Sequence, residues 1–185
     1  MRGICIFCIL ITAFCSICIS QDNIISNPGF ENVEENLPVN WAFIGWFKPE
    51  VKFAIDRDKS NKGKNSASIL ITELTDRLKE FGPPNWAQNI TDNIPLGKTI
   101  RLDAIISTRK VKGIAVIAVQ CLDRDGQLAG FGTTQYDHPV SGDTEWTNIG
   151  FNMKVPDNTK VIRVLCMLSG TGQAWFDDIR ISEAN

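Results

Sequence analysis

The sequence of 185 residues has little of what enzyme active sites commonly use. It contains one histidine, His138, which lies in Tyr136-Asp-His-Pro139 with Ser141 nearby. A catalytic triad needs side chains that converge from separate elements, so these neighbours are a poor match. Between Gln21 and Asn185 there is no Gly-x-Ser-x-Gly, His-Glu-x-x-His or Cys-x-x-Cys pattern. These absences favour a protein that is not an enzyme.

An excess of positive charge is also absent. The chain has 19 Lys and Arg against 21 Asp and Glu, a formal net charge of −2, and no basic stripe. Proteins that bind nucleic acid concentrate positive charge on one face or segment. We therefore expect no nucleic-acid partner.

A long apolar run occurs only at the start of the chain. Arg2 is the only charge in residues 1–20, and an apolar stretch from Ile4 to Ile19 is followed by Ser20. This arrangement is typical of a secretory signal peptide, and the run is shorter than the ~20 residues that span a bilayer. The sequence predicts a signal peptide at 1–20, a single domain at 21–185, secretion to the exterior or periplasm, and no membrane span.

Cysteine is scarce after residue 20. Only Cys121 and Cys166 remain, and both lie in apolar runs. An oxidising compartment permits a disulfide between them. Two buried thiols that pack as small hydrophobic groups are the alternative, which we favour slightly.

Long amphipathic helices are absent, and short apolar or alternating runs separated by turn residues take their place. Such runs predict an all-β sandwich or barrel. In Ile100–Ile106, the alternation predicts that Ile100, Leu102, Ala104 and Ile106 face inward. Only Thr75–Phe81 suggests a turn or two of helix.

Carboxylates stand near both ends of the expected domain. Glu31 follows the turn Asn27-Pro-Gly29, and Asp177 and Asp178 lie in the last strand-like run. If the two ends meet, these side chains can share a hard cation such as Ca²⁺, which prefers carboxylate and carbonyl oxygens. The alternative is a hydrogen-bonded inner carboxylate and an outer one paired with Arg180.

Several motifs occur in an order that resembles one known group of domains. They are Asn27-Pro-Gly-Phe-Glu31, Trp41 after a Pro38 loop, Ala87-Gln-Asn-Ile90 with Leu96-Gly-Lys-Thr99, Glu145-Trp-Thr147, Val155-Pro156 and Ala174-Trp-Phe-Asp-Asp-Ile-Arg-Ile181. This series resembles galactose-binding-like jelly rolls, which include the carbohydrate-binding modules attached to bacterial cellulases and xylanases. The resemblance implies an antiparallel jelly-roll β-sandwich of about eight to ten strands. It also implies a structural Ca²⁺ near the joined ends and a sugar groove on the concave sheet.

Glycan binding uses aromatic rings that stack on sugars and polar groups that fix the hydroxyls. The predicted ligand contacts are the aromatic residues Trp46, Trp86 and Tyr136 and the amides Gln88 and Gln120. The alternative is that the tryptophans pack in the core and the glutamines bond to neighbouring strands. The leading interpretation is a non-catalytic module that binds a polysaccharide or glycan. The alternative function is a structural or protein-interaction module of the cell envelope.

Overall fold

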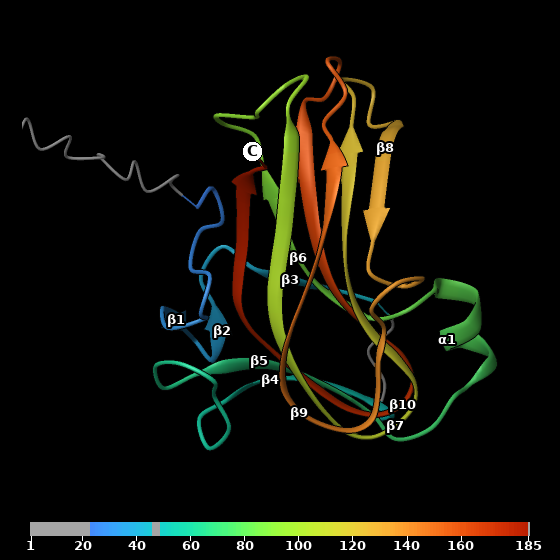
Figure 1. The fold of residues 1–185 in the computed structure, drawn as a ribbon. Helices are drawn as coiled ribbons and strands as arrows, with labels where there is room; N and C mark the ends of the chain where they lie inside the picture. The colour runs from blue at the N-terminus through green and yellow to red at the C-terminus, as the bar shows by residue number, and fades with distance from the viewer. Residues whose placement is uncertain (1–22, 46–48, 185) are drawn as a thin grey trace, which may run out of the picture.

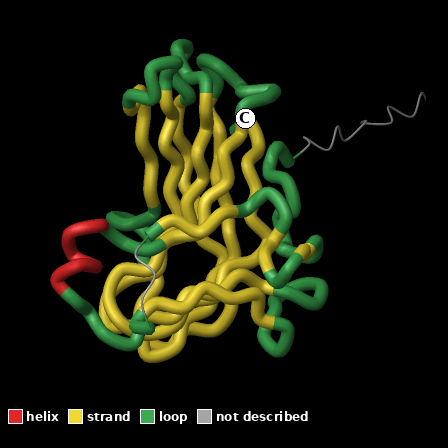
Figure 2. Tube along the Cα trace, turned by 180° about the vertical axis from the view of Figure 1, so that it is seen from behind, coloured by secondary structure: helices red, strands yellow, loops and turns green. Residues whose placement is uncertain are grey.

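The computed structural model describes residues 23–45 and 49–184. These residues form an all-β fold with a single short helix (Figures 1 and 2). In chain order the elements are β1 Val33–Glu34, β2 Leu37–Pro38, β3 Ala42–Ile44, β4 Val51–Asp56, β5 Ser66–Ile71, α1 Asp76–Phe81, β6 Asn85–Ile90, β7 Thr99–Leu122, β8 Leu128–Thr133, β9 Val140–Lys154 and β10 Val161–Glu183. The predicted fold class and the predicted helix are confirmed.

The described residues contain no helix that is long and apolar enough to cross a membrane, since α1 has six residues. Its start is set by Thr75, whose side chain accepts a hydrogen bond from the Leu78 amide. The predicted signal peptide at 1–20 lies outside the described residues.

Two long strands, β7 and β10, run antiparallel along almost their whole length and belong to two sheets. The second half of β7 and the first half of β10 join β3, β6 and β8 in sheet I, with strand order β3-β6-β10-β7-β8. The other halves join β4, β5 and β9 in sheet II, with strand order β4-β5-β10-β7-β9. In Figure 1, β7, β9 and β10 curl from the upper to the lower part of the molecule.

Glycines form the corner at which β7 and β10 pass from one sheet to the other. Gly113, Gly170 and Gly172 have φ of +146°, +95° and +117°, and the pairing register shifts between Thr171 and Gln173. A Cβ atom on Gly170 would lie 2.8 Å from Gly113 Cα and would collide with the Lys112 carbonyl oxygen. The backbones therefore approach more closely here than any side chain permits.

The core lies between the two sheets. Ile100, Leu102, Ala104 and Ile106 are all fully buried, as the alternation predicts. From sheet I, Trp86 packs against the rings of Phe43 and Phe53, with centroid distances of 5.8 and 5.3 Å.

The two ends of the described chain meet, as predicted. Asn23 Nδ2 donates to the Ile179 carbonyl, and the Ile181 amide donates to Asn23 Oδ1, both over 2.9 Å. Figure 1 shows the first described residues beside the end of β10.

Asp178 has a φ of +52° at a register shift in β10, and this bulge moves Ile179 and Ile181 into the core. Regular strand alternation would put Asp177 on the same face as Ile179, and the bulge breaks that alternation.

Cys121 and Cys166 are free and buried, so the favoured alternative is confirmed. In the pairing of β7 with β10, Cys121 lies opposite Ile162 and Cys166 lies opposite Ile117. Four strand positions separate them along the sheet, about 13 Å at the usual rise. A disulfide needs Cα atoms within about 7 Å.

Candidate functional site

A candidate ligand surface is the outer face of sheet I, the side turned away from the core. Phe131 points to this face because a Cβ on either neighbouring glycine, Gly130 or Gly132, would meet core-side atoms of Pro156 or Phe151. The strand register then gives the other outward positions. They are Ala42, Ile44, Asn85, Ala87, Asn89, Val116, Ala118, Gln120, Thr133, Arg163, Leu165 and Met167.

The floor of the outer face is apolar and made of small or medium side chains. Ala87, Ala118 and Leu165 are 5%, 0% and 6% exposed and form a cluster with Met167 that is separate from the main core. By register, Ala87, Leu165 and Ala118 lie in one row across β6, β10 and β7. The outer face therefore carries an apolar strip of two alanines and a leucine between longer side chains.

A polar row runs beside this floor. Asn89, Arg163, Gln120 and Phe131 are register neighbours across β6, β10, β7 and β8. Arg163 Nε donates to Asn89 Oδ1 over 2.9 Å, and Phe131 is 50% exposed. A hollow of about 310 Å³ adjoins the row at the β3–β6 edge and is lined by Asn40, Trp41, Ala42, Ile44, Ala87 and Asn89. Amide and guanidinium donors beside an apolar floor are the groups that bind sugars.

Two predicted ligand contacts lie on the opposite side of β6. Trp86 is fully buried, and its indole Nε1 donates to the Ser68 carbonyl over 3.1 Å. Gln88 is 4% exposed, and its amide both donates to and accepts from the Ser26 backbone over 2.8 Å. The prediction that these side chains face a ligand is corrected, because neither has a free face or an unused amide group.

The other predicted contacts have different outcomes. Gln120 lies half-buried on the outer face, between the core residues Val119 and Cys121. Tyr136 follows β8 and is 82% exposed. Trp46 lies outside the described residues.

Sequence reasoning missed Arg163, Phe131 and Asn89 as members of this face. Arg163 is the only charged residue in the apolar run Val161–Leu168. A strand that is apolar on both faces and carries one charge indicates a covered or ligand-facing side. That signal could have identified Arg163.

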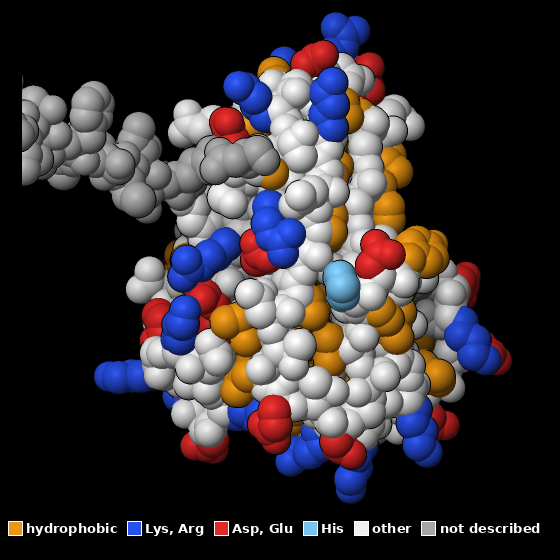
Figure 3. Space-filling view, in the orientation of Figure 1, with side chains coloured by type: hydrophobic (Ala, Val, Ile, Leu, Met, Phe, Trp, Pro, Cys, Tyr) orange, Lys and Arg blue, Asp and Glu red, His pale blue; other side chains and the backbone are white. Residues whose placement is uncertain are grey.

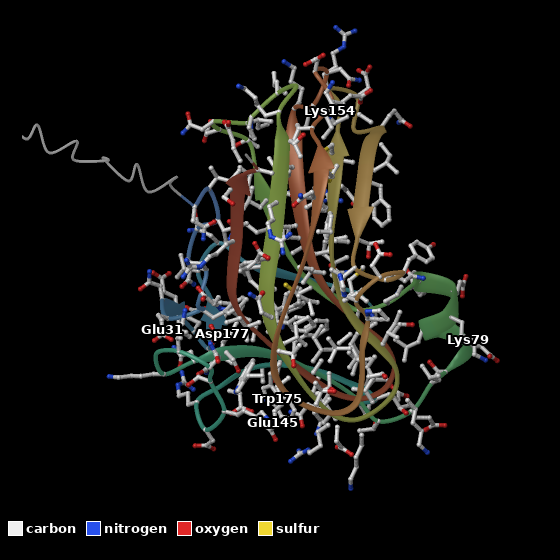
Figure 4. The ribbon with its side chains drawn as sticks, viewed as in Figure 1. Glu31, Lys79, Glu145, Lys154, Trp175 and Asp177 are labelled. Carbon is white, nitrogen blue, oxygen red and sulfur yellow. The ribbon has the colours of Figure 1, made fainter. Side chains whose placement is uncertain are left out.

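The predicted carboxylates only partly come together. Glu31 and Asp177 both point at the loop 61–65, and Figure 4 shows them close to each other. A Cβ on Gly29 would lie 3.5 Å from Asp177 Oδ1 and 3.9 Å from Glu31 Cγ. Asp178 turns away and pairs with Lys62 and Arg180, each over 2.9 Å. Within residues 23–45 and 49–184, no three His, Cys, Asp or Glu side chains gather as a metal centre. The three-carboxylate set is therefore corrected to a pair.

Backbone amides of the loop bind both carboxylates of this pair. Asp177 Oδ2 accepts from the Asn61 and Lys62 amides over 2.9 and 3.1 Å, and Glu31 Oε1 accepts from the Lys64 and Asn65 amides over 2.9 and 3.0 Å. Burial raises the pKa of Asp177, although these hydrogen bonds oppose the shift. For Asp178, burial acts to raise the pKa, but hydrogen bonds from Lys62 and Arg180 and their charges lower it overall. Among the described residues, Asp177 is thus a buried carboxylate held by backbone amides without a cationic side chain beside it, whereas Asp178 pairs with two cationic side chains.

Nothing among the described residues assembles catalytic groups around His138. This histidine is exposed, as Figure 3 also shows, and its backbone amide bonds to the Thr134 carbonyl. On the face drawn in Figure 3, positive and negative side chains are interspersed, with no large area of one sign.

Comparison with known proteins begins with sequence. No family model matches the chain. It is 27% identical over 155 residues to the uncharacterized HTH-type transcriptional regulator YbfP of Bacillus subtilis (strain 168), a match that covers 84% of this chain and 51% of that protein. The chain thus spans about half the length of the curated relative it matches.

Solved structures match over most of the chain. The enzymatically active domain of tailspike protein 4 of bacteriophage CBA120 gives a TM-score of 0.65 at 15% identity, over 88% of this chain and 21% of that one. The xylan-binding domain of Paenibacillus barcinonensis Xyn10C, a family 22 carbohydrate-binding module, gives 0.57 at 14% identity, over 88% and 95% of the two chains. Other carbohydrate-binding modules are also similar. The fold is therefore the galactose-binding-like jelly roll of carbohydrate-binding modules.

Proposed function

We propose that this protein is a secreted, non-catalytic module that binds a polysaccharide or glycan on the outer face of sheet I. The observation that carries the proposal is the polar row of Asn89, Arg163 and Gln120 beside an apolar floor of small side chains. The fold, shared with modules such as a xylan-binding domain, supports it. Phe131 and Tyr136 are the exposed rings that could stack on a sugar.

The first test replaces an amide in this row. A glycan array identifies the ligand, and titration calorimetry then measures its affinity for wild type and Gln120→Ala. We expect the affinity to fall about tenfold, since one buried hydrogen bond is worth roughly 1–2 kcal/mol. The matched control is Gln127→Ala, which changes an exposed glutamine in the β7–β8 turn and should bind as wild type. A folded protein that binds no glycan on the array would disprove the proposal.

A second candidate is a protein-interaction module, and the surface of β8 favours it. Leu128, Phe131 and Tyr136 are 58%, 50% and 82% exposed within a short segment. Exposed apolar side chains that lie close together can mark a contact surface for a partner protein. Loss of glycan binding in Gln120→Ala would argue against this alternative.

We also propose a structural Ca²⁺ held by Glu31 and Asp177 together with carbonyl oxygens of the adjacent loop. The two side chains approach the loop from one side, and Ca²⁺ accepts such mixed oxygen ligands. The ion would give Asp177 a cationic partner, since its buried charge is otherwise offset by backbone amides alone.

Thermal unfolding in calcium and in EDTA tests the ion. At a free calcium concentration a hundredfold above the dissociation constant, calcium binding stabilises the folded protein by about 2.7 kcal/mol. We therefore expect EDTA to lower Tm by roughly 5–10 °C. Glu31→Gln should remove the difference between calcium and EDTA, whereas Asp103→Asn, at a surface ion pair with Arg101, should keep it. An equal Tm in both buffers for wild type would show that Glu31 and Asp177 act only as caps for the loop amides.

A further inference from the structure

Arg163 is an isolated positive charge in the middle of an uncharged face. Among the outward positions of sheet I defined above, it is the only ionisable side chain. In the described part of the chain, no Asp or Glu oxygen lies within 4.0 Å of its guanidinium. Arg163 is half-buried, and burial of a charge costs free energy unless a counter-ion or hydrogen bonds offset it.

The contacts of Arg163 leave one side of its guanidinium unused. Nε donates to Asn89 Oδ1, which fixes the orientation of the group. No described residue accepts a hydrogen bond from its two terminal nitrogens. These nitrogens form a planar fork that matches a carboxylate in a bidentate arrangement.

We propose that the outer face of sheet I recognises an acidic polysaccharide, with Arg163 binding the carboxylate of a uronic acid residue. The inference rests on the proposed function, because it assigns a ligand class to the same face. The apolar floor of Ala87, Leu165 and Ala118 would lie under the sugar ring next to the one that carries the charge, and Gln120 would bind a hydroxyl. Asn89 acts as the positioning residue that holds the guanidinium.

The test compares polygalacturonate with the same polymer after its carboxyl groups have been reduced, which replaces each carboxylate with a neutral hydroxymethyl group. Affinities are measured for wild type, Arg163→Gln, Arg163→Lys and Gln120→Ala, with Tm recorded to confirm folding. Wild type should bind the acidic polymer at least about tenfold more tightly, in line with a charge-assisted hydrogen-bond pair. Arg163→Gln should abolish this preference and keep the weaker binding to the reduced polymer. Arg163→Lys, which keeps the charge but not the fork, should keep only part of the preference.

Other outcomes distinguish a failure of the acidic ligand class from a failure of glycan binding itself. Equal wild-type affinity for both polymers, with both weakened in Gln120→Ala, would overturn the acidic ligand and leave glycan binding in place. Failure to bind these polymers or any other glycan would overturn both. Dextran sulfate is tested as an additional polymer. If it binds as tightly as polygalacturonate, the anionic group that Arg163 binds would be a sulfate and not a carboxylate. A preference that survives in Arg163→Gln would remove this residue from the site.

Discussion

Replacing Gly170 with alanine is expected to lower the unfolding free energy by about 4 kcal/mol or more, among the largest effects seen for single substitutions. The added Cβ would meet the Lys112 carbonyl oxygen and would lie 2.8 Å from Gly113 Cα. These are backbone atoms of the paired strand, so no side-chain rotation relieves the contact. In addition, the φ of +95° is unfavourable for any residue with a Cβ. For a domain of this size the change corresponds to a fall in Tm of roughly 8–16 °C.

Gly126→Ala is the matched control for this substitution. Gly126 also has a positive φ, +75°, but no atom lies within 4 Å of the Cβ that alanine would add. Only the backbone strain remains, about 1–2 kcal/mol. Thermal and urea unfolding of both variants measure the difference. If Gly170→Ala lost no more stability than Gly126→Ala, the result would contradict the claim that the backbones of β7 and β10 are too close at the corner to admit a side chain.

Trp86→Ala is expected to cost about 3–5 kcal/mol of stability, the usual range for removal of a buried tryptophan. The indole is fully buried on the core side of sheet I and packs edge-on against the stacked rings of Phe43 and Phe53. Its loss leaves a cavity and removes the donor to the Ser68 carbonyl. Trp86→Phe keeps part of the ring volume and should lose roughly half as much. Urea unfolding measures both variants.

Glycan affinity distinguishes this core role from the ligand role that the sequence predicts. The folded fraction of Trp86→Phe should bind the ligand identified on the array as wild type does, because Trp86 does not reach the surface. An unchanged stability together with lost binding would restore Trp86 to the ligand site.

The strands could be predicted from sequence, but their continuity could not. The sequence has separate apolar or alternating runs at 98–108 and 113–122, which together form the single strand β7. Two further runs, at 160–168 and 173–182, together form β10. Glycine between two apolar runs indicates a change of direction. It does not reveal whether the inter-strand hydrogen bonds continue through that change. In this fold they do, because β7 and β10 bend together at Gly113 and Gly170.

The candidate site was less predictable because sheet I carries buried apolar residues on both faces. In β6, Trp86 and Gln88 face the core while Ala87 and Asn89 face outward. Polarity does not decide between the two faces, since Gln88 lies on one and Asn89 on the other, and a buried glutamine is uncommon unless its amide is bonded. The partner that satisfies Gln88 is the backbone of Ser26, 62 residues away, which no local pattern reveals.

The proximity of Glu31 and Asp177 was predictable because the ends of the chain meet. Their hydrogen bonds were not, because they depend on the conformation of the loop that contains Gly63, whose φ is +69°. The separation of Asp178 from this pair likewise depends on the bulge in β10.

The sharing of β7 and β10 between the two sheets has a consequence for cooperativity. Neither sheet has its own central strands, so one sheet cannot separate from the other while keeping its hydrogen bonds. Local opening that spares one sheet would require β7 and β10 to break at the corner, where their backbones are closest. The domain should therefore open as a single unit, and a ligand on sheet I would slow hydrogen exchange at amides of sheet II that it never touches.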